Sequence, residues 1–72
     1  MAEQEKTLLM QAKSFVKKFY RFPNYIYVGK VKVERDVIVK LVERLIGKPF
    51  QWYKRRKVVG QLDDAIALLQ QA

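Results

Sequence analysis

Residues 25–34 read YIYVGKVKVE, and this stretch decides which class of fold the chain can adopt. Most of its residues are β-branched or aromatic, and apolar and charged residues alternate from Lys30 onward, as is typical of a strand. Two arrangements are open. One is a single strand bulged at Gly29, which puts Lys30 and Lys32 on one face. The other is a hairpin with the two-residue loop Gly29-Lys30, because glycine at the first central position suits a type II′ turn. We favour the single strand, over about residues 25–33.

An amphipathic helix is predicted before this strand, over residues 3–21. Its apolar residues recur at helical spacing and fill an arc of about 120°. Pro23 ends the helix, because it pushes Phe22 out of helical geometry and cannot continue the hydrogen-bond ladder. The apolar residues are Leu8, Leu9, Ala12, Phe15, Val16 and Phe19.

A second helix is predicted after the strand, over residues 35–46. Asp36 is the best available N-cap, and Gly47 supplies the C-terminal stop. The apolar residues of 37–46 span about 200° of the helical wheel, far wider than the stripe of about 100° on a typical surface helix. This helix therefore needs cover on two sides. Domains of roughly 70–80 residues or fewer often need a disulfide, a metal or a partner subunit to stay folded. We therefore expect a homodimer through the apolar face of residues 37–46.

The last third of the chain is predicted to contain one extended segment and one helix. Residues 50–59 place Phe50, Trp52 and the valines all around a helical wheel, so extended structure fits better. It is either one strand or a hairpin whose turn is the basic run, and Gly60 ends it. A helix follows at 61–71, with Asp63 and Asp64 in its first turn. The predicted order is helix, strand, helix, strand, helix. We expect one small α+β domain, with a two- or three-stranded sheet packed on helices.

The positive charge of the chain is concentrated. Fifteen Lys and Arg stand against seven Asp and Glu, a net charge of +8 over 72 residues. All fifteen bases lie between Lys6 and Lys57, where only three acids occur, so this stretch carries +12. Such a surface attracts phosphate backbones, anionic lipid or acidic proteins. A generic solvated surface is the alternative.

The composition argues against catalysis and against a bound cofactor. The chain contains no His and no Cys, which removes disulfides, most metal sites and the usual catalytic triads and dyads. Its three glycines are isolated, so no phosphate-binding loop is present. No apolar run approaches the roughly 18 residues of a membrane span, and the acidic residues 1–5 are unlike a signal peptide. We expect a soluble cytoplasmic protein without enzymatic activity.

The strongest candidate site is the run of bases that follows two large aromatic residues. Arg forks onto phosphate oxygens, Lys adds mobile charge, and aromatic faces stack on unpaired bases. Alternatively, Trp52 and Tyr53 are core anchors beside a solvated turn. Lys30 and Lys32 form a second candidate, as a ribbon lying along a groove or as lysines that protect a sheet edge. The candidate binding residues are Lys30, Lys32, Lys48, Trp52, Tyr53, Lys54, Arg55, Arg56 and Lys57.

A third candidate is the basic stripe of the first helix, which could track phosphates, lie on a membrane surface or form an ordinary solvated face. The stripe contains Lys6, Lys13, Lys17 and Arg21, with Lys18 nearby. Taken together, these features predict a small DNA-binding protein, a regulator or accessory factor that acts through charge and shape. Two alternatives stay open: an adaptor whose basic face meets an acidic protein, and an RNA or single-strand binder that stacks bases on Trp52 and Tyr53.

Overall fold

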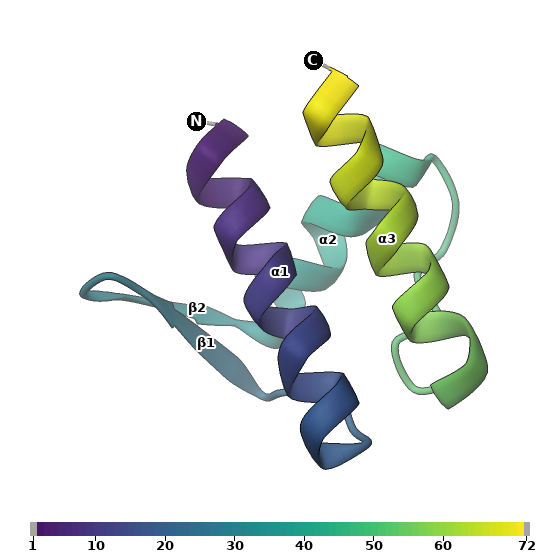
Figure 1. Cartoon of the computed structure of the whole chain (residues 1–72), viewed down its shortest axis with the longest axis horizontal. Helices are drawn as coiled ribbons and strands as arrows, with labels where there is room; N and C mark the ends of the chain where they lie inside the picture. The colour runs from purple at the N-terminus through teal and green to yellow at the C-terminus, as the bar shows by residue number, and fades with distance from the viewer. Residues whose placement is uncertain (1, 72) are drawn as a thin grey trace.

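The computed structural model describes residues 2–71 and contains three helices and one β-hairpin. The elements are α1 (Ala2–Phe19), β1 (Tyr25–Val28), β2 (Val31–Glu34), α2 (Arg35–Ile46) and α3 (Arg55–Gln71). α1 and α3 lie side by side and run in opposite directions, α2 crosses them, and the hairpin projects to one side (Figure 1). The α+β class is confirmed. The predicted order is wrong, because both strands precede α2 and two helices follow them.

Helix α1 forms where the apolar spacing predicts it, but it ends two residues early. Leu9, Ala12 and Val16 are buried along one side of the helix. Tyr20 takes a left-handed conformation with φ of 59° while its N–H still donates to the Val16 carbonyl at 2.8 Å. This conformation stops the helix before the restriction imposed by Pro23 is reached.

The stretch 25–34 is a hairpin, so the preference for a single strand was wrong. β1 and β2 pair antiparallel, with Ile26 opposite Val33 and Tyr27 opposite Lys32. Gly29 has a φ of 64° and Lys30 does not have a positive φ, which is the pattern of a type II′ turn. The turn fits because it keeps Ile26 and Val33 on one face, which packs toward the helices.

Helix α2 has the predicted bounds, 35–46. Gly47 ends it in a left-handed conformation with φ of 71°, and its N–H donates to the Glu43 carbonyl, as expected. The predicted N-cap is wrong. The N-cap residue is Glu34, for which no side-chain capping hydrogen bond is present among the described residues, and Asp36 lies in the first turn.

The segment after α2 differs most from the prediction. Residues 47–54 form an irregular loop, α3 begins at Arg55, and the predicted extended segment 50–59 is absent from the described chain. Gly60 does not end a strand but lies exposed inside α3, where glycine costs about 1 kcal/mol relative to alanine without breaking the helix. Asp63 and Asp64 therefore lie well inside α3 rather than in its first turn.

Side chains from both neighbouring helices hold this loop. The buried Gln61 accepts a hydrogen bond from the Gln51 N–H at 2.7 Å and donates one to the Pro49 carbonyl at 3.2 Å. The Phe50 N–H donates to Glu43 of α2 at 3.0 Å. These hydrogen bonds satisfy backbone N–H and C=O groups that a strand would pair with a neighbouring strand. The loop can therefore stay irregular although it contains apolar and β-forming residues.

The core lies where the three helices meet, and the loop residues Phe22 and Phe50 close it. Most of the wide apolar face of α2 is covered within one chain, but Val37 is 56% exposed. The homodimer through residues 37–46 stays a prediction. The buried apolar residues are Leu8, Leu9, Ala12, Val16, Phe22, Ile26, Ile38, Leu41, Val42, Phe50, Val58, Leu62, Ala65 and Leu69.

Candidate nucleic-acid interface

The run of four bases forms the beginning of α3. The Lys54 carbonyl accepts hydrogen bonds from the N–H groups of Lys57 at 3.0 Å and Val58 at 2.9 Å, which closes the first turn. The four basic side chains are exposed, and the first turn of the described helix contains no acidic residue. A helix N-terminus carries a partial positive charge, so each cation there is unfavourable by roughly 0.3–1 kcal/mol. An anion bound at this position would offset the repulsion among the four cations and their unfavourable interaction with the helix dipole.

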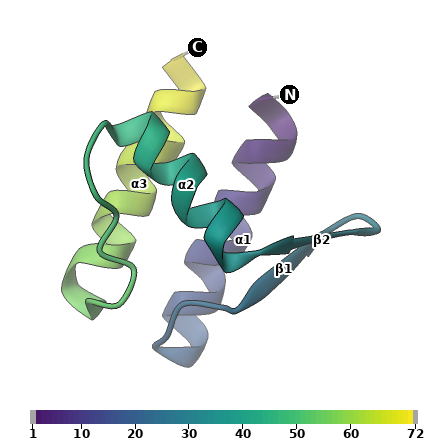
Figure 2. The same cartoon turned by 180° about the vertical axis from the view of Figure 1, so that it is seen from behind.

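The end of α1 lies against the beginning of α3. Because the two helices are antiparallel, residues far apart in the chain meet at one end of the molecule (Figure 2). The Arg55 guanidinium lies 4.5 Å from the centre of the Tyr20 ring, directly across this junction. We call this region the basic end. Its seven exposed bases are Lys17, Lys18, Arg21, Lys54, Arg55, Arg56 and Lys57.

The sequence explains why this end is free of negative charge. No Asp or Glu occurs in residues 6–33, which contain the end of α1, or in residues 44–62, which contain the start of α3. The acids of α1 lie in its first turn, at Glu3 and Glu5, at the opposite end of that helix. The charges of α1 therefore change sign along the helix, from acidic in its first turn to basic in its last turn.

Lys48 joins the basic end from the loop. It lines a surface hollow together with Arg56 and Lys57, so this part of the predicted site is brought together. Asp64 lines the same hollow, about two helical turns beyond Lys57 along α3. Lys48 thus extends the positive surface along one side of the helix.

The two aromatic residues before the run have different positions. Trp52 is half-buried, packs on Phe22 with ring centres 6.2 Å apart, and has the Arg35 guanidinium 4.3 Å from its ring centre. Tyr53 is 66% exposed and meets Trp52 edge to face at 5.7 Å. Trp52 therefore packs against the core and is also partly exposed, whereas Tyr53 is the more accessible of the two rings.

The hairpin lysines separate. Lys30 lies in the turn, and the turn projects away from the helices, far from the start of α3 (Figure 1). Lys32 lies in the middle of the hairpin, opposite Tyr27, and its Nζ is 4.7 Å from the centre of the Tyr25 ring. The structure therefore does not bring Lys30 to the run of bases, and it gives Lys32 an aromatic neighbour that the sequence reading did not consider.

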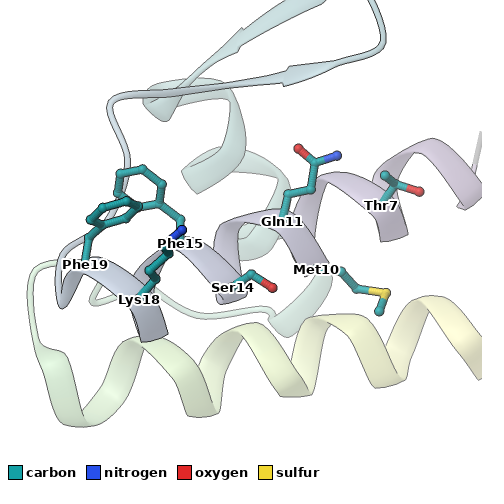
Figure 3. Close-up of a pocket in the computed structure, with 7 residues that line it drawn as sticks. All are labelled: Thr7, Met10, Gln11, Ser14, Phe15, Lys18 and Phe19. Atoms are coloured by element: carbon teal, nitrogen blue, oxygen red, sulfur yellow. The ribbon is translucent and has the colours of Figure 1, made fainter.

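The basic stripe of α1 also divides. Lys13 pairs with Asp63 of α3 at 2.5 Å, so it serves helix packing. Lys17, Lys18 and Arg21 belong to the basic end. Along the outer side of α1 runs a shallow hollow in which Lys18 is the charged residue, with the rings of Phe15 and Phe19 together at one end (Figure 3). Lys18 thus belongs both to this hollow and to the basic end. No other basic residue lines the hollow, so the hollow itself offers no array of cations.

Four residues with a place in the site were missed by the sequence reading: Tyr20, Tyr25, Tyr27 and Arg35. The spacing of Tyr25 and Tyr27 was the available signal, since residues two apart in a strand share a face. The contacts of Arg35 with Trp52 and of Arg55 with Tyr20 join distant parts of the chain and had no local signal.

No protein-family model matches the chain, and neither a curated protein nor a solved structure matches it significantly. Across residues 2–71, no helix has the length and apolarity needed to cross a bilayer. The same residues contain no group of three or more acidic side chains placed to hold a metal ion.

Proposed function

We propose that this protein binds nucleic acid, and specifically DNA. In this proposal the phosphates of the DNA contact the basic end. One observation carries the proposal: seven exposed bases lie at the end of α1, at the start of α3 and in the residues that flank these two helix ends, in stretches of chain without a single acid. Concentrated cations of this kind provide the electrostatic, sequence-independent part of nucleic-acid affinity.

Each element contributes a different kind of contact. Arg56 can fork onto two phosphate oxygens, and Lys54 and Lys57 act as mobile point charges. The first N–H groups of α3 have no partner within the helix, and helix N-termini bind phosphate for this reason. These contacts fix the position of a nucleic acid without reading its sequence. The role that fits them is that of a small regulator or accessory factor.

The proposed activity involves no chemistry. The chain contains no His and no Cys, and its hydroxyl groups outside the tyrosines are Thr7 and Ser14. Both lie on α1 and line the hollow of Figure 3, where neither His nor Cys is available to act with them. We therefore assign binding rather than catalysis.

A salt titration tests the proposal. If about six phosphates are neutralised, the logarithm of the binding constant for duplex DNA should fall against the logarithm of salt concentration with a slope near −5. Fluorescence anisotropy of a labelled duplex between about 50 and 200 mM salt measures this slope. A flat response, or no binding at the lowest salt, would contradict the proposal and favour an acidic protein as the partner.

Two matched double variants show whether the basic end is responsible. R56Q/K57Q removes two charges from the start of α3, and K40Q/R44Q removes one Lys and one Arg, also exposed, from α2. We expect the first pair to reduce the magnitude of the slope by about 2 and the second to leave it nearly unchanged. Equal effects of both pairs would mean that total charge, and not this end of the molecule, determines binding.

A further inference from the structure

The outward face of the hairpin carries two exposed aromatic rings. Tyr25 and Tyr27 are 49% and 53% exposed, and their ring centres lie 5.7 Å apart. Their cross-strand partners Glu34 and Lys32 complete this face, while Ile26 and Val33 lie on the opposite one. Tyrosine rings that are left half in water, beside a lysine, provide flat apolar surfaces next to positive charge.

Arg35 connects this face to the loop before α3. It lines one surface hollow together with Tyr25, Lys32 and the two acids Glu34 and Asp36. Its guanidinium donates a hydrogen bond of 3.1 Å to the side chain of Asn24. On its other side, its guanidinium lies 4.3 Å from the centre of the Trp52 ring. The surface therefore continues from the hairpin to the loop without a break.

Tyr53 carries the surface on to the basic end. Its ring meets that of Trp52 at 5.7 Å, and Lys54 follows it directly. Aromatic rings and cations thus succeed one another along the molecule. We call this surface the aromatic track. It consists of Tyr27, Tyr25, Lys32, Arg35, Trp52 and Tyr53.

We infer that the aromatic track binds unpaired bases, so that the preferred ligand of this protein is single-stranded DNA. The inference rests on the proposed function and specifies its substrate. Bases stack on the exposed rings of Tyr25, Tyr27 and Tyr53, and the phosphates between them contact Lys32, Arg35 and the basic end.

The chemistry of the track distinguishes single strands from duplexes. In a duplex the bases are stacked on each other and present only their edges in the grooves, so an aromatic face finds no base face to cover. In a single strand every base has an available face, and aromatic residues in a positively charged groove are the common means of binding it. The basic end alone would accept either ligand. The half-exposed rings favour the single strand.

The test compares oligothymidylate of about 15 nucleotides with a duplex of equal length, both labelled, by fluorescence anisotropy at constant low salt. For the intact protein we expect tighter binding of the single strand. Y25T/Y27T should weaken single-strand binding about 100-fold, roughly tenfold for each ring, and leave duplex binding unchanged. Y25F/Y27F keeps both rings and should bind like the original chain.

Two controls separate stacking from damage to the hairpin. V31T changes an exposed residue on the opposite face of the same hairpin and should bind both ligands normally. Trp52 is the only tryptophan and lies within the track. Its emission should therefore fall when the single strand binds the original chain, and stay constant when the duplex binds at equal occupancy. This second measurement needs no variant that might not fold.

The outcomes are distinguishable. Equal affinities for both ligands, no effect of Y25T/Y27T and a loss of both with R56Q/K57Q would overturn the inference and leave the proposed function standing. No binding of either ligand at low salt would overturn both. A parallel titration with oligouridylate compares single-stranded RNA with single-stranded DNA. A clear preference for the RNA would overturn the inference that single-stranded DNA is the preferred ligand.

Discussion

The cations of the basic end and the aromatic rings of the hairpin face lie on different kinds of secondary structure. The basic end is built on two long antiparallel helices, whose buried side chains fix the spacing of the cations that they carry. The hairpin face lies on two strands of four residues each, and only Ile26 of that hairpin is buried. Charge acts over several ångströms and tolerates loose placement, whereas stacking requires contact. From this comparison we expect that the proposed affinity and the proposed strand preference can be altered separately in this small chain.

The largest effect is expected from the helical core that α3 shares. Leu62 of α3 is fully buried, so L62A should lower the free energy of unfolding by about 2–5 kcal/mol. V31A, at a residue of the hairpin that is 64% exposed, should change it by less than about 0.5 kcal/mol. Urea denaturation followed by circular dichroism measures both. Similar losses in the two variants would contradict the difference in support described above.

The loop that carries Lys48 and Tyr53 should depend on Gln61. Q61A leaves the Gln51 N–H and the Pro49 carbonyl without their partners, so we expect a loss of about 1–3 kcal/mol in the free energy of unfolding. Q70A removes the same side chain from an exposed position of α3 and serves as the control. Hydrogen exchange at Gln51 should accelerate in Q61A alone. An unchanged exchange rate there would mean that the loop is held by other contacts.

Two glycines should respond to alanine with opposite signs. Gly29 has a φ of 64°, which a side chain disfavours, so G29A should destabilise the hairpin turn by about 1 kcal/mol. Gly60 lies exposed within α3 with open space around its Cβ position, so G60A should stabilise the chain by about 1 kcal/mol. Thermal unfolding of the two variants checks both signs. A stabilising G29A would show that the turn is not of type II′.

The smallest effect is the most specific to function. R56Q/K57Q removes two exposed cations from the positive end of a helix dipole, so the unbound variant should be more stable by about 0.6 kcal/mol, the lower end of the range for two such charges. The same variant should bind nucleic acid more weakly. A gain in stability combined with a loss of affinity indicates that these charges are kept for binding. A loss of both would instead assign Arg56 and Lys57 a role in the fold.

Much of the fold could be predicted from the sequence where local patterns and tertiary packing agree. The bounds of α2 follow from its apolar spacing and from Gly47. Residues 47–61 could not be read in this way, because the first turn of α3 is exposed and shows no apolar periodicity, while Phe50 reaches the core from a loop. Gly29 suits both a bulged strand and a type II′ turn, so the local sequence does not distinguish the two. Only the packing of one hairpin face against the helices decides between them.

The candidate site was predictable in part for a similar reason. Lys54–Lys57 is visible as a run of charge, and Tyr53 as its exposed neighbour. The contacts of Tyr20 with Arg55 and of Arg35 with Trp52 depend on how the helices pack, so the sequence offered no sign of them. The antiparallel arrangement of α1 and α3 turned two separate basic segments into one surface.

The central claim is that nucleic acid lies along the basic end and the aromatic track, and NMR titration of the 72-residue chain tests it most directly. Adding oligothymidylate to the labelled protein should shift the amide signals of residues 17–21, 52–57 and the hairpin residues Tyr25, Tyr27 and Lys32. The amides of residues 7–14 on α1 and 40–46 on α2 should stay in place. Shifts centred on those two segments, with the basic end unaffected, would contradict the account.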